Sequence, residues 1–155
     1  MRVLVVYYSW QGHTGRVAKA LSDLLGAGLV RIEPVSESGM MGKAFGAMFG
    51  KRSPIRPCKT DLSDVDFLVL ASPVWAGKIP PYINEYIEEI SNGTGKPFSV
   101  LVEMRGSGGD KAVAFAKARL EKKGMRFVSS AQTKEADVDA GRFDDTIKRF
   151  AGTIR

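Results

Sequence analysis

The chain has 155 residues, of which 44% are hydrophobic and 26% are charged, with a formal net charge of +6. This composition is typical of one folded domain over residues 1–155, and it argues against a disordered or collagen-like chain. The longest apolar runs are strand-sized, far shorter than the roughly 20 residues that a membrane-spanning helix needs, so we expect no membrane insertion.

The first part of the chain predicts alternating strands and helices. Residues 3–8 form an uninterrupted β-branched and aromatic run, which indicates a strand covered on both faces. We expect Thr14 to cap a helix that ends at Gly26, because apolar residues follow helical spacing between them. Residues 29–34 and 66–72 are then the second and third strands.

A segment rich in methionine, phenylalanine and glycine, residues 39–50, lies between these two strands. Its Met and Phe side chains share one face of a predicted helix, and Gly42, Gly46 and Gly50 recur on a neighbouring face. We expect a crossover helix packed closely on the domain. The alternative is a flap over a ligand or a dimer contact, since methionine adapts to irregular surfaces.

The second half of the chain continues the alternation of strands and helices. The expected elements are a helix from Pro80 and Pro81 to residue 90, a strand at 98–104, a helix at 111–123 capped by Asp110, a strand at 125–131 and a helix at 139–154. Five strands joined by right-handed crossovers predict an α/β fold, a doubly wound parallel sheet in a single domain. Its ligand site lies beyond the carboxyl ends of the strands, so the loops after strands one, three and four are the informative ones.

The loop after the first strand has the composition of an anion-binding turn. Short hydroxyl and glycine residues before a helix let backbone N–H groups converge on a phosphate. The sequence has neither the Gly-Lys-Ser/Thr ending of a P-loop nor a GxGxxG motif, which disfavours ATP, GTP and a conventional NAD site. The alternative is an ordinary capped loop. We interpret the one histidine as a positioning or surface residue rather than a catalytic group. The candidate phosphate-binding residues are Ser9, Trp10, Gln11, Gly12, His13 and Thr14.

The loop after the third strand presents a tryptophan on a stiff segment. Prolines and a glycine restrict the backbone around Trp75, and an aromatic ring on a rigid loop is suited to stacking on a flat ligand. The alternative is a tryptophan of the core or of an interface. The candidate ligand-contacting residues are Pro73, Val74, Trp75, Ala76 and Gly77.

The loop after the fourth strand is rich in glycine and exposes bare backbone at the same edge of the sheet. Its N–H groups can meet the carbonyl edge of a ring, and Arg105 can stabilise negative charge there. A mobile linker is the alternative. The candidate residues are Arg105, Gly106, Ser107, Gly108 and Gly109.

Two of these loops resemble loops of a known family, the flavodoxins. Residues 8–15 resemble the FMN-phosphate loop, a Ser/Thr-x-Thr-Gly-x-Thr pattern, and residues 72–77 resemble the flavin-contacting loop. The resemblance implies a flavodoxin-like three-layer sandwich with the strand order 2-1-3-4-5 and FMN as cofactor. It also implies phosphate binding by Ser9, Gly12, His13 and Thr14, and isoalloxazine binding by Pro73 to Gly77 and Arg105 to Gly109.

The chain departs from the flavodoxin pattern in three ways. Gln11 stands where the pattern usually has threonine, so one hydroxyl contact is replaced or lost. Electron-shuttling flavodoxins are strongly acidic, whereas this chain carries a net charge of +6. The loop after the fourth strand lacks the tyrosine that often covers the flavin, which leaves one ring face open to solvent, to residues 39–50 or to a substrate.

The resemblance favours an FMN-binding electron-transfer protein. The alternatives are an FMN-dependent oxidoreductase of the NAD(P)H:quinone type and a flavodoxin-shaped interaction module without flavin; we favour the carrier over the stand-alone reductase. We expect redox proteins or a small electron acceptor as partners, and no nucleic acid. The expected oligomeric state is a monomer or a homodimer. No catalytic residue and no metal site is assigned, and Cys58 is expected to be structural. Without a recognisable signal peptide, the expected location is the cytoplasm.

Overall fold

The computed structural model describes residues 1–36 and 52–154. At its centre is a five-stranded sheet in the order β2-β1-β3-β4-β5, with every neighbouring pair parallel, which confirms the predicted doubly wound arrangement. The segment 39–50, for which we predicted a crossover helix or a flap, lies outside the described residues. The strands are β1 (Val3–Tyr7), β2 (Gly28–Arg31), β3 (Phe67–Pro73), β4 (Pro97–Met104) and β5 (Arg126–Lys134).

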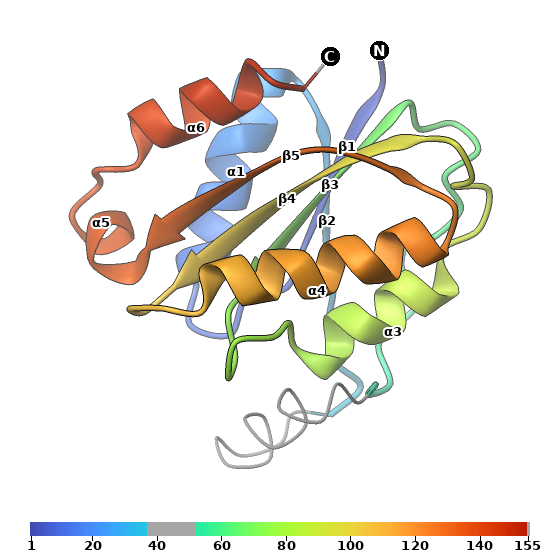
Figure 1. Cartoon of the computed structure of the whole chain (residues 1–155), viewed down its shortest axis with the longest axis horizontal. Coiled ribbons are helices and arrows are strands. Elements are labelled where there is room, and N and C mark those ends of the chain that lie inside the picture. The colour runs from blue at the N-terminus through green and yellow to red at the C-terminus, as the bar shows by residue number, and fades with distance from the viewer. Residues whose placement is uncertain (37–51, 155) are drawn as a thin grey trace.

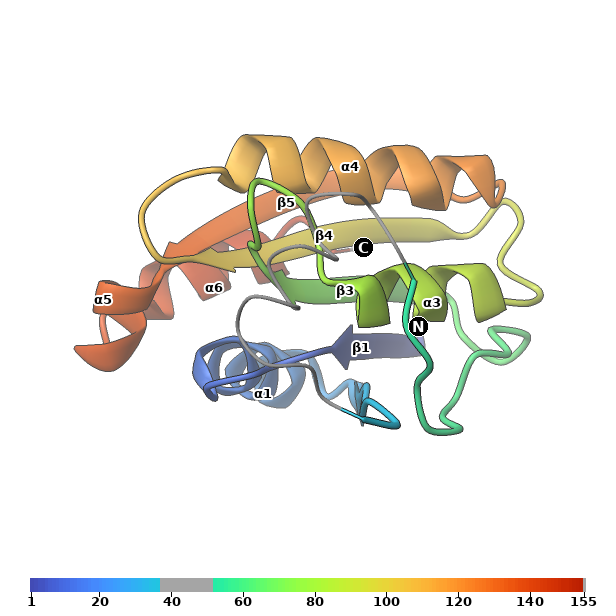
Figure 2. The same cartoon turned by 90° about the horizontal axis from the view of Figure 1, so that it is seen from below.

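Helices cover both faces of this sheet. Helices α1 and α6 lie on one face and α3 and α4 on the other, while the short α5 follows the end of β5 (Figures 1 and 2). Within the described ranges, no helix combines the length and the apolar character that crossing a membrane would require. The helices are α1 (His13–Leu25), α3 (Pro81–Glu89), α4 (Gly109–Lys122), α5 (Glu135–Asp139) and α6 (Asp144–Ala151).

Each strand contributes to two separate cores, because successive residues point to opposite faces of the sheet. On β1, Leu4 and Val6 belong to the core beneath α3 and α4, whereas Val5 belongs to the core beneath α1 and α6. All seven residues of β3 are buried. Burial on both faces therefore explains why the central strands are continuous apolar runs rather than alternating ones.

The predicted C-terminal helix over residues 139–154 begins too early, because α6 starts at Asp144 and residue 139 is the last residue of the separate helix α5. Strand β5 continues to Lys134, where it pairs with Met104, and α5 follows it directly. Gly141 has a φ of 70° and Arg142 donates a backbone hydrogen bond to Asp137. This left-handed turn closes α5 before α6 begins, and a helical spacing pattern does not reveal such a break.

Both predicted N-terminal helix caps are also wrong, because glycines take their places. Gly12, with a φ of 95°, precedes α1, and Thr14 lies inside the helix. Gly108, with a φ of 91°, precedes α4, and Asp110 lies in its first turn. Neither helix has a side-chain hydrogen bond at its N-cap. The prediction rested on the preference of polar residues for N-cap positions. The backbone at both caps is left-handed, a conformation that favours glycine.

The second strand is shorter than the predicted span of residues 29–34. It runs from Gly28 to Arg31, paired with β1, and the chain then bends. Pro34 lacks the N–H group that a continuing strand needs, and it forms an isolated antiparallel bridge with Ile55 instead.

At the amino ends of the strands, Lys96 connects the start of β4 to the loop before β3. Its Nζ donates to the carbonyl oxygens of Leu62, of Val65 at 2.7 Å and of Ser63 at 3.3 Å. One ammonium group thereby satisfies three main-chain acceptors of a turn.

We expect Lys96→Met to lower the free energy of unfolding by about 1–3 kcal/mol, because charged donors are lost from partly buried carbonyl groups. Urea denaturation measures the change. The matched control is Lys148→Met on the exposed side of α6, which should stay within about 0.5 kcal/mol of the original protein. Equal stability of both variants would contradict this role of Lys96.

Candidate functional site

The carboxyl ends of β1, β3 and β4 deliver their loops to one side of the sheet, where α5 also lies (Figure 1). The three loops enclose a cavity of about 170 Å³. Beside it is a wider, open groove of about 1070 Å³. Val74 and Arg105 line both spaces, so the cavity and the groove are neighbours, and we treat them as one candidate site.

The first loop presents the uncapped N-terminus of α1. Gly12 turns the chain with its left-handed backbone, and its N–H donates to Oγ of Ser9 at 3.0 Å. In the described part of the chain, no acceptor is recorded for the backbone N–H groups of Gln11, His13 and Thr14. Such groups at a helix N-terminus carry partial positive charge, so an anion fits there.

The second loop holds Trp75 at the base of a two-residue turn. Trp75 and Lys78 exchange backbone hydrogen bonds of 2.9 Å in both directions. The central residues have positive φ, 51° at Ala76 and 72° at Gly77, which is typical of a type I′ turn. Trp75 thereby lines the cavity, while Ala76 and Gly77 line the groove.

The Trp75 ring packs against three aromatic neighbours in T-shaped arrangements. Its centroid lies 5.6 Å from Tyr8, 6.3 Å from Trp10 and 6.4 Å from Tyr82, with interplanar angles of 80–90°. Edge-to-face packing restricts the orientation of the indole. Trp75 is only partly buried and lines the cavity, so it presents a rigid aromatic surface to a ligand.

The third loop approaches the second so closely that it needs glycine. A Cβ on Gly108 would lie 3.2 Å from Cα of Gly77 and 3.2 Å from Cγ1 of Val74. A Cβ on Gly109 would lie 2.3 Å from Oε1 of Gln132, inside van der Waals contact. The bare backbone of this loop therefore forms one wall of the open groove.

A buried carboxyl group lies at the floor of the cavity. Glu103, near the end of β4, is only 8% exposed, and Oγ1 of Thr14 donates to its Oε2 at 3.5 Å. Burial raises the pKa of Glu103. His13 and the Thr14 hydrogen bond oppose this rise in pKa, whereas the negative charges of Glu135 and Asp139 add to it.

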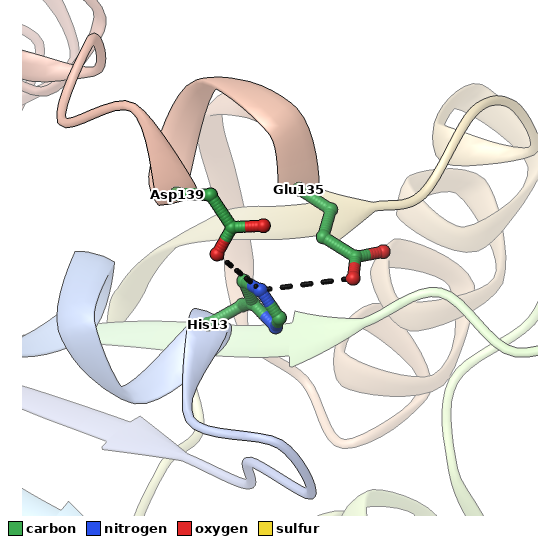
Figure 3. Close-up of side chains that lie close together, drawn as sticks. All are labelled: His13, Glu135 and Asp139. Carbon is green, nitrogen blue, oxygen red and sulfur yellow. Dashed lines mark hydrogen bonds and ion pairs between the residues drawn. The ribbon is translucent and has the colours of Figure 1, made fainter.

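The side chain of His13 points to α5, where it meets two carboxylates (Figure 3). Its Nε2 lies 2.8 Å from Oδ1 of Asp139 and 3.7 Å from Oε1 of Glu135. The other oxygen of Glu135, Oε2, lies 3.8 Å from Nε of Arg105, whose side chain is 94% exposed. His13 therefore connects the first loop to α5, and it also lines the cavity.

The structure gathers nearly all of the residues predicted for the site. Gly12 is the exception: it lines a separate hollow beside Tyr7 and Arg16, and it contributes to the site through its backbone turn. The cavity is lined by Ser9, Trp10, Gln11, His13, Thr14, Pro73, Val74, Trp75 and Arg105. The groove is lined by Val74, Ala76, Gly77, Arg105, Gly106, Ser107, Gly108 and Gly109.

Several residues that line the site were not among those predicted from the sequence, and Glu103, Glu135 and Gln132 are three of them. Glu103 is a charged residue at the end of an otherwise apolar strand, and this contrast was a usable signal. The sequence carries no comparable signal for Glu135, because this residue lies beyond the strand end predicted at residue 131. Gln132, whose Nε2 donates to Oδ1 of Asp110 at 2.6 Å, was missed for the same reason.

Searches with family models and among curated proteins return no match for this chain. Solved structures do match it. A flavoprotein from Lactobacillus acidophilus in complex with FMN has a TM-score of 0.75 and 18% sequence identity, covering 90% of this chain and 97% of that chain. For oxidised flavodoxin 2 from Bacillus cereus, the TM-score is 0.64 and the identity 21%, with 99% of this chain and 97% of that chain covered.

A flavodoxin from the domain Archaea is also similar, with a TM-score of 0.60 and 15% identity over 96% of this chain and 98% of that chain. At these identities the shared property is the backbone architecture, and each structure is matched over almost its whole length. The strand order, the helical layers and these similarities together show that the chain has the flavodoxin-like fold.

Proposed function

We propose that this protein binds one FMN and serves as an electron carrier. The observation that carries the proposal is the convergence of three loops on one site, with an uncapped helix N-terminus at one end and a fixed tryptophan at the other. The similarity to a flavoprotein in complex with FMN supports the same cofactor.

The first loop suits the phosphate of FMN. Backbone N–H groups at Gln11, His13 and Thr14 are available as donors, and the N-terminus of α1 favours negative charge. The hydroxyl group of Ser9 adds a donor beside them, whereas that of Thr14 donates to Glu103. No lysine is needed in such a loop, because the helix end and the N–H groups supply the positive potential.

The second and third loops suit the isoalloxazine ring. FMN, when bound, accepts and releases one or two electrons. Trp75 would cover part of the ring and exclude water, while the backbone of residues 106–109 would donate to its polar edge. Arg105 would place positive charge near that edge, although its ion pair with Glu135 offsets part of this charge.

The groove beside the third loop is open, so a redox partner or a small electron acceptor could reach a flavin bound there. The sequence also lacks the GxGxxG motif of a conventional dinucleotide site. We therefore propose a redox protein or a small electron acceptor as the reaction partner.

Titration of the protein with FMN tests cofactor binding, followed by flavin absorption and fluorescence. We expect one FMN per chain. Trp75→Ala should weaken binding by about tenfold because a stacking surface is lost, whereas Trp75→Phe should retain most of the affinity. Unchanged flavin spectra with the original protein would refute FMN binding and would favour an interaction module without flavin.

The pH dependence of FMN binding tests the position of Glu103. As pH rises through the raised pKa of Glu103, its carboxylate ionises beside the phosphate loop, so repulsion should weaken binding. At pH 8, Glu103→Gln should bind FMN roughly three- to tenfold more tightly than the original protein. The affinity ratio of the two proteins is the readout, since it cancels the effects of pH that do not involve Glu103.

Riboflavin, which lacks the phosphate, is the control ligand for this pH experiment. The ratio of the riboflavin affinities of Glu103→Gln and the original protein should change much less with pH. A Glu103→Gln variant whose FMN affinity follows that of the original protein from pH 5 to pH 8 would contradict the placement of the phosphate beside Glu103.

Oxidation of NADPH by the FMN-loaded protein separates the carrier from the reductase. A carrier should oxidise NADPH no faster than free FMN, yet accept electrons from a separate NADPH-dependent flavoprotein reductase. Steady NADPH oxidation with a quinone and the purified protein alone would instead establish the oxidoreductase alternative.

A further inference from the structure

Three potential metal ligands meet at the junction of α1 and α5. Nε2 of His13 and one carboxylate oxygen each from Glu135 and Asp139 lie within 4.8 Å of one another. They come from two segments distant in sequence, and Glu135 and Asp139 share one side of α5 at the i, i+4 spacing (Figure 3).

The separations are close to those of a metal coordination sphere. Ligand atoms about 2.0–2.2 Å from a tetrahedral zinc ion are separated by about 3.4 Å. The His13–Asp139 distance of 2.8 Å is shorter than this value and the His13–Glu135 distance of 3.7 Å is longer. Small side-chain rotations would equalise them, and they are available because the Asp139 side chain is 63% exposed.

We propose that His13, Glu135 and Asp139 form a binding site for one divalent transition-metal ion such as Zn²⁺. One imidazole with two carboxylates is a borderline donor set, suited to first-row transition metals more than to Mg²⁺. Three protein ligands leave a coordination position open. His13 and Glu135 also line the cavity, so this position can face it and take a water molecule or a ligand oxygen.

The surroundings of the cluster support this assignment. The side chain of His13 is 16% exposed and that of Glu135 is 27% exposed, so two of the ligands are partly shielded from water. Arg105 approaches the Glu135 oxygen that faces away from His13, which would orient this carboxylate as an outer-shell partner does. A bound dication would also offset the two negative charges that α5 places beside the phosphate loop.

The single histidine of the chain provides a direct test. Zn²⁺ is titrated into the full-length protein without an affinity tag and without FMN, so the result does not depend on the proposed cofactor. Calorimetry measures stoichiometry and affinity, and the ¹⁵N signals of the one imidazole report whether Nε2 becomes a metal ligand.

The variants compared are His13→Gln, Asp139→Asn and, as matched control, Asp137→Asn. Asp137 lies on the same short helix but pairs with Arg142 at 3.5 Å instead of His13. We expect one Zn²⁺ per chain, a marked shift of the imidazole nitrogen signals, and affinity at least about tenfold weaker in both ligand variants. Asp137→Asn should bind Zn²⁺ within about twofold of the original protein, because an exposed pair contributes little.

Imidazole signals that stay unchanged at saturating Zn²⁺ would overturn the proposal and leave the cluster as an ion pair between α1 and α5. A Zn²⁺ affinity within about twofold of the original protein in His13→Gln would overturn it as well, since the ion would then sit elsewhere, for example at the Cys58 thiol.

Discussion

Burial of the sheet on both faces is the constraint on which the rest of the structure depends. Helical crossovers between parallel strands cover each face, and because the strands are parallel, the loops after β1, β3 and β4 all emerge at one edge. No single loop is distinctive. Their convergence places an uncapped helix N-terminus, a rigid tryptophan and a glycine-rich backbone around one space, and this arrangement makes FMN the cofactor that we propose.

Charge balance distinguishes this site from a simple phosphate cradle. The N–H groups of the first loop favour an anion, yet Glu103, Glu135 and Asp139 bring three carboxyl groups close to it. His13 and Arg105 offset only part of that charge. A protonated Glu103 or a bound dication would each reduce the remaining repulsion, so ligand binding at this site should be linked to protons, to metal ions or to both.

The sequence predicted the parts of the molecule that follow from local pattern. Continuous apolar runs identified the buried strands, and their alternation with helices identified the edge where the loops meet. The breaks were harder: the left-handed turn at Gly141 lies inside the predicted C-terminal helix, and glycine rather than Thr14 or Asp110 precedes α1 and α4. The His13–Asp139 contact joins residues 126 positions apart, so only the three-dimensional fold reveals it.

The central claim is that the main chain of the first loop binds a phosphate. The most direct measurement is the change in backbone amide ¹H and ¹⁵N chemical shifts when FMN, and separately riboflavin, is added to the ¹⁵N-labelled protein. The account predicts that the amides of Gln11, His13 and Thr14 shift strongly with FMN and little with riboflavin, whereas residues 106–109 shift with both. Equal shifts of the first loop with the two ligands, or none with either, would contradict it.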